Sequence, residues 1–267
     1  MPNQDGNYWQ SVVNQRPASN VQNLWRLHMK GVYADLLDRW TDNSRSKHIL
    51  KTDLYDEAVT PCNLISLLQN SRRITGIDVS FEVAALAKQR LQKEQNRRCN
   101  VVVCDTRKFA FKSGAFDEII SNSTLDHFPK KKDIAIALRE LYRILKPRGI
   151  LIITLDNPLN PIVSLRNMLP YRLLKSLGLI QYYVGRTLSK SELIRMLELS
   201  GFKTQSITFI DHTPRLLVVW IGYILEKINI RVIKTCFHRI LENCEYLQRT
   251  PLRNFTGNFV AAKAIKQ

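Results

Sequence analysis

Polar side chains end several short apolar runs of this sequence, and many of them are carboxylates. Five such runs are each followed by acidic or other polar residues. If the runs are parallel strands, their carboxyl ends meet at one edge of a sheet, where open α/β sheets bind ligands. We therefore expect one shared site, formed by Asp53, Asp78, Asp105, the trio Ser121, Asn122 and Ser123, and Asp156.

Asp78 is the most informative of these residues. A carboxylate at the end of the second strand can accept hydrogen bonds from both hydroxyls of an adenosine ribose, as in dinucleotide-binding folds. The alternative is that Asp78 caps the helix that follows. Ser80 stands closer to that helix and is the better cap, so we favour the ribose role.

The surrounding pattern predicts the elements that would position these groups. Apolar strands alternate with amphipathic helices, which implies right-handed crossovers and a mainly parallel, buried sheet. The expected strands are 46–53, 73–78, 100–105, 116–121 and 150–155, with helices over 58–70, 81–93 and 132–145. Residues 146–149 (KPRG) are expected to end the last of these helices.

The alternation stops after residue 155. Residues 156–187 contain Pro158, Pro161 and Pro170 and are interpreted as an irregular insertion. Ser189 and Glu192 form a capping-box pattern for a helix over 189–200. The remaining expected elements are a strand over 203–210, two helical pieces over 214–247, a last strand over 257–265 antiparallel to 203–210, and an N-terminal helix over 22–40.

The chain is basic, with a formal net charge of +17, and no carboxylate lies between Asp156 and Glu192. Such a surface suits nucleic acid, an anionic membrane or an acidic substrate, although high charge also serves solubility alone. The five cysteines form no CxxC pair and are interpreted as reduced thiols. The N-terminus lacks an apolar signal region, and the longest apolar run, Leu216–Leu225, is too short to span a bilayer. We expect a cytoplasmic protein, with membrane association as an open alternative.

Three segments resemble the S-adenosylmethionine (SAM)-binding core of class I methyltransferases. They are GIDVS (76–80), VVCDTRKFAFKSGAFDEIISNSTLDHF (102–128) and LRELYRILKPRGILIIT (138–154). The resemblance implies a doubly wound, Rossmann-like α/β fold, with a seven-stranded mainly parallel sheet, helices on both faces and helical insertions. It also implies an N-terminal helical cap over 1–45 and a methyltransferase domain over 46–267. Within that domain, the cofactor-binding core would be 46–155 and the acceptor-side insertion 156–187.

The resemblance carries roles over to matching positions. Asp78, with Val79 and Ser80 beside it, would bind the ribose of SAM. Asp105 would accept the adenine amino group, with Thr106 next to it. The trio 121–123 would line the methionine end of the cofactor.

One motif departs from the family. Class I methyltransferases usually have a glycine-rich turn after the first strand, but the equivalent segment here, ILKTDLYDEA (49–58), has no glycine. Asp53, Asp56 and Glu57 could compensate by pairing with the ammonium and sulfonium groups of SAM. They could equally form a solvated turn and a favourable helix N-terminus.

The catalytic group is expected just past the fourth strand. Methyl transfer is an in-line displacement, and a base is needed only if the acceptor must lose a proton. His127 is the candidate base and Asp126 its neighbour, with His212 as the alternative. Tyr182 and Tyr183 would shape the acceptor pocket or simply pack in the core.

The resulting hypothesis is methyl transfer from SAM to a small-molecule acceptor, lipid-linked or anionic. A nucleic-acid (RNA) methyltransferase is an alternative, although SNST (121–124) lacks the Pro-Pro-aromatic element of enzymes that methylate base amino groups. A catalytically inactive binding protein is another, because the glycine turn is missing. No metal cluster is expected, and the sequence leaves the oligomeric state open.

Overall fold

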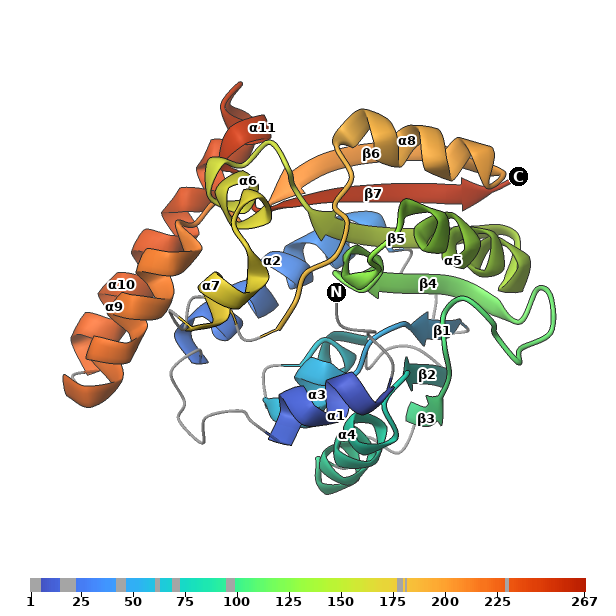
Figure 1. The fold of residues 1–267 in the computed structure, drawn as a ribbon, viewed down its shortest axis with the longest axis horizontal. Helices are drawn as coiled ribbons and strands as arrows, with labels where there is room; N and C mark the ends of the chain where they lie inside the picture. The colour runs from blue at the N-terminus through green and yellow to red at the C-terminus, as the bar shows by residue number, and fades with distance from the viewer. Residues whose placement is uncertain are drawn as a thin grey trace.

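The chain forms one seven-stranded sheet covered by helices on both faces, as the computed structural model shows (Figure 1). The structure describes residues 6–14, 23–41, 47–60, 63–68, 73–94, 99–176, 180, 182–228 and 231–267. The strand order across the sheet is β3-β2-β1-β4-β5-β7-β6. The strands are β1 His48–Lys51, β2 Arg73–Asp78, β3 Cys99–Val103, β4 Phe116–Asn122, β5 Leu145–Asp156, β6 Phe202–Ile210 and β7 Phe259–Lys266.

The pairing confirms the predicted sheet. The five strands from β3 to β5 are parallel to their neighbours, and β7 runs antiparallel to both β5 and β6. The expected pairing of the last strand with 203–210 is therefore confirmed. Because β1 lies between β2 and β4, the carboxyl ends of β2, β1 and β4 are neighbours at the ligand-binding edge.

The helices agree with expectation in most places. Their bounds are α1 Gly6–Asn14, α2 Asn23–Trp40, α3 Tyr55–Val59, α4 Phe81–Lys93, α5 Lys131–Ile144, α6 Pro161–Met168, α7 Tyr171–Ser176, α8 Lys190–Leu199, α9 Arg215–Ile228, α10 Arg231–Cys244 and α11 Arg253–Thr256. Three short 3-10 helices add to these: η1 Ile65–Leu68, η2 Leu125–His127 and η3 Glu245–Arg249.

Three sequence expectations need correction. The single helix expected over 58–70 is two short pieces, α3 and η1. The insertion 156–187 is not wholly irregular, because each of Pro161 and Pro170 stands at or just before a helix start, where proline is tolerated. The helix α5 ends at Ile144 and β5 begins at once, since Leu145 pairs with Phe116 across a bulge.

Two layers of core form because the buried strands are apolar on both sides. Ile119 faces the layer that contains α5 and α8, whereas Ile120 faces the layer that contains α2, α3 and α4. Successive strand side chains point to opposite faces, so adjacent isoleucines serve different layers. The rigid sheet between these layers fixes the positions of the strand ends that build the site.

The helix α8 illustrates how local signals set element boundaries. The Ser189 hydroxyl accepts from the Glu192 amide while the Glu192 carboxylate accepts from the Ser189 amide, which is the predicted capping box. The helix ends at Leu199, with Ser200 as its C-cap, and the next residue is Gly201, whose φ of 96° suits glycine. Among the helices that the structure describes, none combines the length and apolar content needed to cross a bilayer.

A glycine is required in β2 rather than in the turn after β1. Gly76 lies against the buried side chain of Leu54, and a Cβ at position 76 would come within 2.5 Å of Leu54 Cδ2. The turn can therefore approach β2 closely, although the turn itself has no glycine.

We expect Gly76→Ala to lower the free energy of unfolding by about 1–3 kcal/mol, because both positions are buried and the contact is overpacked. Urea unfolding measures this, and Leu54→Ala supplies the second arm of a double-mutant cycle. The double variant should lose at least about 0.5 kcal/mol less than the sum of the single losses. If the two losses were strictly additive, the contact between position 76 and Leu54 would not be the cause of the destabilisation.

Candidate cofactor site

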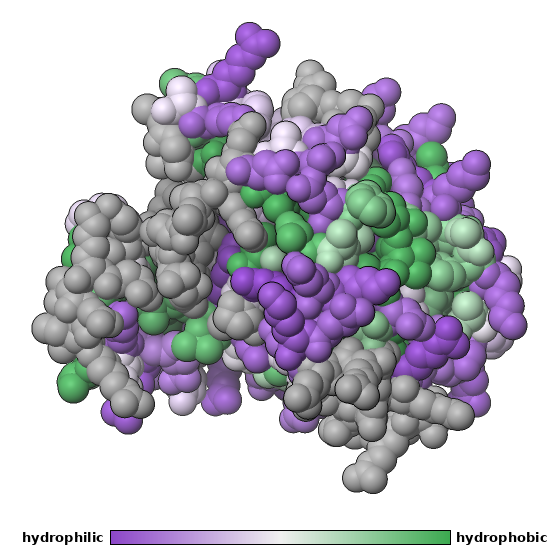
Figure 2. Space-filling view, turned by 90° about the horizontal axis from the view of Figure 1, so that it is seen from below, coloured by the Kyte–Doolittle hydropathy of each residue, from purple (hydrophilic) through white to green (hydrophobic). Residues whose placement is uncertain are grey.

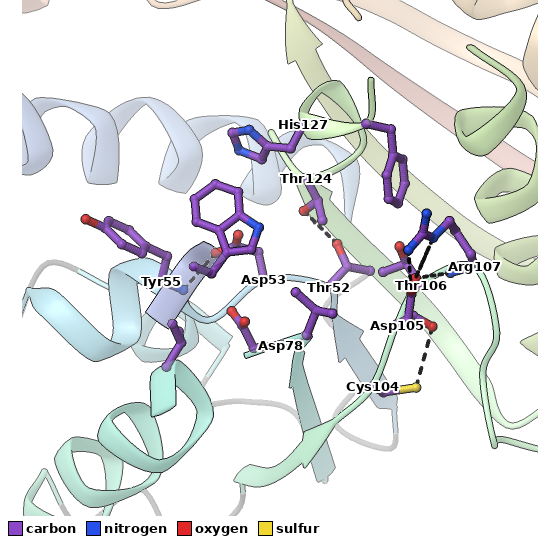
Figure 3. Close-up of a pocket in the computed structure, with 14 residues that line it drawn as sticks. Thr52, Asp53, Tyr55, Asp78, Cys104, Asp105, Thr106, Arg107, Thr124 and His127 are labelled. Carbon is purple, nitrogen blue, oxygen red and sulfur yellow. Dashed lines mark hydrogen bonds and ion pairs between the residues drawn. The ribbon is translucent and has the colours of Figure 1, made fainter. Parts of the chain in front are cut away.

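A pocket opens at the carboxyl ends of β1, β2 and β3 and beside the turn after β4 (Figure 3). Asp53 and Asp78 lie toward one end of it, and Asp105 and Arg107 lie at the other. The lining residues are Trp9, Thr52, Asp53, Tyr55, Asp78, Val79, Val83, Cys104, Asp105, Thr106, Arg107, Thr124, His127 and Phe128. Five predicted cofactor residues are thus brought together: Asp53, Asp78, Val79, Asp105 and Thr106.

A buried ion pair shapes the turn that lacks glycine. Lys51 at the end of β1 and Glu57 on α3 are both fully buried, with Lys51 Nζ 2.9 Å from Glu57 Oε2. Lys51 also donates to the Asp53 carbonyl. Burial alone would lower the pKa of Lys51, but the carboxylates of Glu57, Asp53 and Asp56 outweigh it and raise that pKa. The lysine is thus held as a cation behind the turn.

Glu57 consequently has a structural place rather than a cofactor-binding one. Its other oxygen accepts from the Leu64 and Ile65 amides, at 3.2 and 3.4 Å, at the start of η1. Neither Glu57 nor Asp56 is among the residues that line the pocket. Of the three carboxylates expected at the methionine end, only Asp53 faces it.

Asp53 and Asp78 form the acidic end of the pocket. Burial raises the pKa of Asp53 to about 7, with Lys51 opposing and Asp78 adding to the rise. Burial also raises the pKa of Asp78 to about 6, although the Ser80 and Leu54 amides oppose this by hydrogen bonding. Two carboxylates that repel each other in a dry cleft favour a cation between or beside them.

The carboxylate of Asp78 keeps part of its hydrogen-bonding capacity. Oδ1 accepts from the Ser80 amide at 2.8 Å and Oδ2 from the Leu54 amide at 3.2 Å. An ionised carboxylate has about four acceptor positions, so two remain for a ligand. Ser80 itself is buried outside the pocket lining and caps α4 by accepting from the Val83 amide.

The opposite end of the pocket is occupied by an ion pair. Arg107 donates to both oxygens of Asp105, from Nη2 to Oδ2 at 2.6 Å and from Nε to Oδ1 at 3.1 Å, and its guanidinium lies 5.1 Å from the centre of the Phe128 ring. Burial alone would raise the pKa of Asp105, but the hydrogen bonds from Arg107 lower it below its ordinary value. The role expected for Asp105, acceptance of an adenine amino group, stays a prediction, and in this structure it would share the carboxylate with Arg107.

The trio 121–123 is not on the pocket wall. Ser121 accepts from the Thr52 hydroxyl at 3.0 Å, and Ser123 donates to Asp126 at 2.9 Å. Asn122 is buried at the end of β4. The next residue, Thr124, lines the pocket instead and contacts Thr52 at 2.9 Å. The role expected for the trio at the methionine end of SAM stays a prediction.

His127 faces the pocket beside three aromatic rings. The ring centre of Trp9 lies 4.8 Å from that of His127 and 6.3 Å from that of Tyr55, and Tyr182 lies 5.4 Å from His127. Burial lowers the pKa of His127, so the imidazole is neutral at pH 7, and its Nδ1 has no partner among the described residues. A neutral imidazole with a free nitrogen can accept a proton.

Two segments close this end of the site. The Tyr183 amide donates to the Tyr8 hydroxyl at 2.6 Å, which joins α1 to the segment 182–189. The Gly185 amide donates to the carbonyl of Asp126, and a side chain at 185 would meet the Phe128 carbonyl. The sequence analysis did not predict α1, although Tyr8, Trp9, Val12 and Val13 recur at helical spacing and would have been the signal for it.

The other predicted catalytic residues lie elsewhere. Asp126 is fully buried outside the pocket lining, where Oδ2 accepts from the Ser123 hydroxyl and the Asp156 amide. Both ring nitrogens of His212 have protein partners, Thr256 at 2.7 Å and the Phe209 carbonyl at 3.2 Å. These geometries describe structural roles for Asp126 and His212.

One group of potential metal ligands lies apart from the lining residues. His28, Asp211 and Glu245 each offer an atom within 4.8 Å of the others. His28 is paired with Glu245 at 3.1 Å, and Asp211 accepts from the Thr213 hydroxyl at 2.6 Å. The expectation that the protein holds no metal stays a prediction.

Residues 59–153 match the family model described as a methyltransferase domain. These residues are similar to a methyltransferase domain, and the chain has the fold of class I SAM-dependent methyltransferases. This confirms the resemblance found in the sequence at the level of the domain and its fold. The match includes most of the elements that carry the pocket, although β1 and the turn after it precede it.

Relatives of this chain share only part of their length with it. Phosphoethanolamine N-methyltransferase 2 of Caenorhabditis elegans is 29% identical over 82 residues, which are 31% of this chain and 18% of that protein. Probable tRNA methyltransferase 9B of Mus musculus is 41% identical over 59 residues, 22% of this chain and 13% of that protein. The chain thus spans less than a fifth of the length of either relative.

Solved structures agree over nearly the whole chain. The crystal structure of a SAM-dependent methyltransferase from Thermotoga maritima superposes with a TM-score of 0.59, covering 98% of this chain and 99% of that one, at 15% sequence identity. At this identity the likeness establishes the fold alone.

Removal of the buried cation should unfold the turn of this methyltransferase domain. We expect Lys51→Met to cost about 3–5 kcal/mol, because Glu57 would remain buried without its partner. The double variant Lys51→Met/Glu57→Gln should recover more than half of that loss, since glutamine still accepts from the Leu64 and Ile65 amides. Chemical unfolding checks both values, and an equally unstable double variant would contradict the account.

Asp126 should make the protein less stable as pH rises. Burial raises its pKa to about 7, with Asp156 adding to the rise, so between about pH 4 and 7 the folded chain binds more protons than the unfolded one. The contribution of Asp126 to the free energy of unfolding is therefore greatest below pH 4 and falls as pH rises through 7.

The variant Asp126→Asn keeps an oxygen acceptor and removes this titration. At pH 8 it should be more stable than the parent by on the order of 2 kcal/mol, and its stability should vary less between pH 4 and 8. Thermal and urea unfolding across this range measure both effects, with the exposed Asp38→Asn as control. A less stable Asp126→Asn at pH 8 would refute the burial argument.

Proposed function

We propose that this protein transfers the methyl group of SAM to a small-molecule acceptor. The observation that carries the proposal is a pair of carboxylates, the partly buried Asp53 and the buried Asp78, which line one pocket of a chain similar to methyltransferase domains. SAM supplies an electrophilic methyl group on a sulfonium, and its methionine end adds an ammonium. The donor set fits this ligand because both carboxylates have raised pKa values, a sign that their charge lacks a sufficient partner.

The roles of the pocket residues follow from their positions. Asp78 would accept the ribose hydroxyls with the two acceptor positions that the Ser80 and Leu54 amides leave. Asp53 would pair with the cationic methionine end. Val79 and Thr106 would contact the ribose and adenine from the ends of β2 and β3, where both line the pocket.

His127 is the proposed proton acceptor. As the acceptor atom takes the methyl group and the sulfonium leaves as a thioether, any proton on that atom must depart. The unpartnered Nδ1 of a neutral His127 could receive it. The rings of Trp9, Tyr55 and Tyr182 would keep water from the methyl group and hold the acceptor in line.

Aromatic rings surround His127, which favours a small acceptor over a folded polymer. The C. elegans relative carries an N-methyltransferase name and supports this choice. We place the protein in the cytoplasm, where SAM is made, with lipid-linked acceptors included among the candidates.

RNA is the second candidate acceptor. The match to probable tRNA methyltransferase 9B and the net charge of +17 favour it. Salt-dependent gel-shift binding of tRNA would support this alternative, since phosphate contacts weaken steeply as salt rises.

Calorimetric titration with SAM and with its demethylated product tests the cofactor site. We expect saturable binding, weakened about 10–100-fold in Asp78→Asn because charged hydrogen bonds are lost. Asp38→Asn, exposed on α2, is the matched control and should bind as the parent does. No binding at millimolar ligand would overturn the proposal and favour a catalytically inactive binding protein.

The same titration should depend on pH. Asp78 and Asp53, with pKa values near 6 and 7, must be ionised to bind a cation, so lowering the pH protonates them. We expect affinity for SAM to fall about tenfold between pH 8 and 6, with proton release on binding at pH 6.5. Unchanged affinity over this range would remove both carboxylates from the cofactor site.

A further inference from the structure

The helices α6 and α7 turn their apolar side chains away from the protein. We define the α6–α7 face by six exposed residues, which are Leu159, Ile162, Leu165, Met168, Leu169 and Leu173. Met168 is 79% exposed and Leu165 is 58% exposed. Isolated exposed leucines are ordinary, but six large apolar residues within fifteen positions form a patch that needs an occupant.

The apolar residues of α6 are exposed because of the way the helix is turned on the protein. Ile162, Leu165 and Leu169 are spaced by three and four residues and so share one side, while Val163 on another side is buried. A helix on a soluble core would place this apolar side inward. Here the wider apolar side faces out.

Polar contacts fix the helix in this orientation. The side chain of Asn160 caps α6 by accepting from the Ile162 and Val163 amides, and its amide group donates to the Thr256 carbonyl at 3.1 Å. Arg166 donates to the buried Asp156 at 2.8 Å. Rotation of the apolar side inward would break these contacts, so the face is held outward.

The charged residues of the segment that carries the face are positive. Arg172 and Lys175 on α7 are exposed, and the sequence has no carboxylate between Asp156 and Glu192. Apolar side chains interleaved with cations are the pattern of helices that lie in a membrane interface, where the cations meet anionic headgroups. We propose that the α6–α7 face docks the protein on an anionic phospholipid bilayer.

A second copy of the chain fits this face less well. A symmetric dimer places the same patch against itself, so Arg172 and Lys175 of one copy would approach their equivalents without a carboxylate between them. Figure 2 shows the molecule from below the view of Figure 1, where hydrophilic side chains at the centre lie beside hydrophobic ones.

Other apolar residues extend the exposed surface. Leu217 and Trp220 on α9 are 56% and 63% exposed, and α9 lies toward the same end of the molecule as α7 in Figure 1. Tryptophan is enriched where a membrane meets water because its ring is amphipathic.

Docking through this face would also serve the acceptor. Asn167 on α6 donates to Thr187, and the segment 182–189 carries Tyr182 to the ring of His127. A bound bilayer would therefore lie one short segment away from the pocket. This last step rests on the proposed function and makes the acceptor a bilayer-resident molecule, whereas the docking itself does not depend on methyl transfer.

Vesicle sedimentation of the full chain tests the docking. The probes are vesicles of phosphatidylcholine alone and of phosphatidylcholine mixed with phosphatidylglycerol. We expect binding to the mixed vesicles, weakened about tenfold by Leu165→Ser/Met168→Ser, because these apolar groups leave the interface. Arg172→Glu/Lys175→Glu should weaken it by about fivefold or more per charge.

The matched control is Leu199→Ser. Leu199 is 75% exposed at the end of α8, so it tests the loss of an exposed leucine outside the face. Circular dichroism and SAM titration of every variant show that fold and cofactor site persist. The proposal would be overturned if Leu165→Ser/Met168→Ser bound the mixed vesicles as tightly as the parent, or if the parent bound both vesicle types equally.

Two further results separate the possible failures. If the parent protein binds SAM but does not bind mixed vesicles, the docking proposal fails and the proposed function stands. If vesicles bind and SAM does not, the docking stands and the proposed function fails. A parent dimer in light scattering that Leu165→Ser/Met168→Ser dissociates would identify a second copy as the occupant and overturn the bilayer assignment.

Discussion

A lysine ammonium buried at the end of β1 is the constraint from which the cofactor site follows. Lys51 and Glu57 are both inaccessible to water, and each would be costly to bury without the other. The pair fastens α3 to the strand end, and its contact with the Asp53 carbonyl fixes the turn between them. A glycine-rich turn reaches a ligand by omitting side chains. The turn after β1 keeps its side chains and is instead held in place by Lys51, which pairs with Glu57 and donates to the Asp53 carbonyl.

The consequences of this turn spread to the neighbouring strand. Leu54 packs on Gly76, and the Leu54 amide reaches the Asp78 carboxylate, so the glycine that permits close approach has its place in β2. The same arrangement leaves Asp53 and Asp78 in one dry cleft with raised pKa values. Lys51 offsets part of this charge from behind, and the remainder faces the pocket, which suits a cationic ligand.

The acceptor side of the pocket depends on aromatic packing rather than on a buried ion pair. Trp9 and Tyr182 come from segments far apart in the chain and meet over His127, while α6 is turned outward by its cap and by the Arg166–Asp156 pair. Aromatic packing thus closes the pocket where methyl transfer would occur, and an apolar, cationic face lies beside it. The two features agree with a small acceptor delivered from a bilayer.

The sequence by itself determined the sheet, because continuous apolar runs such as 150–155 and alternating helices leave few other arrangements. It also placed Asp53, Asp78 and Asp105 at one edge, since strand ends in a parallel sheet must meet there. Only the tertiary structure decided that Glu57 pairs with Lys51 and Arg107 with Asp105. It also decided that Thr124, rather than residues 121–123, is among the residues that line the pocket. The physical reason is that strand register and periodicity fix where a backbone ends, whereas the partner that a side chain finds depends on contacts between distant segments. The N-terminal Trp9 is the clearest case, because its place in the pocket depends on contacts with His127 and Tyr182, which are more than a hundred residues away in the chain.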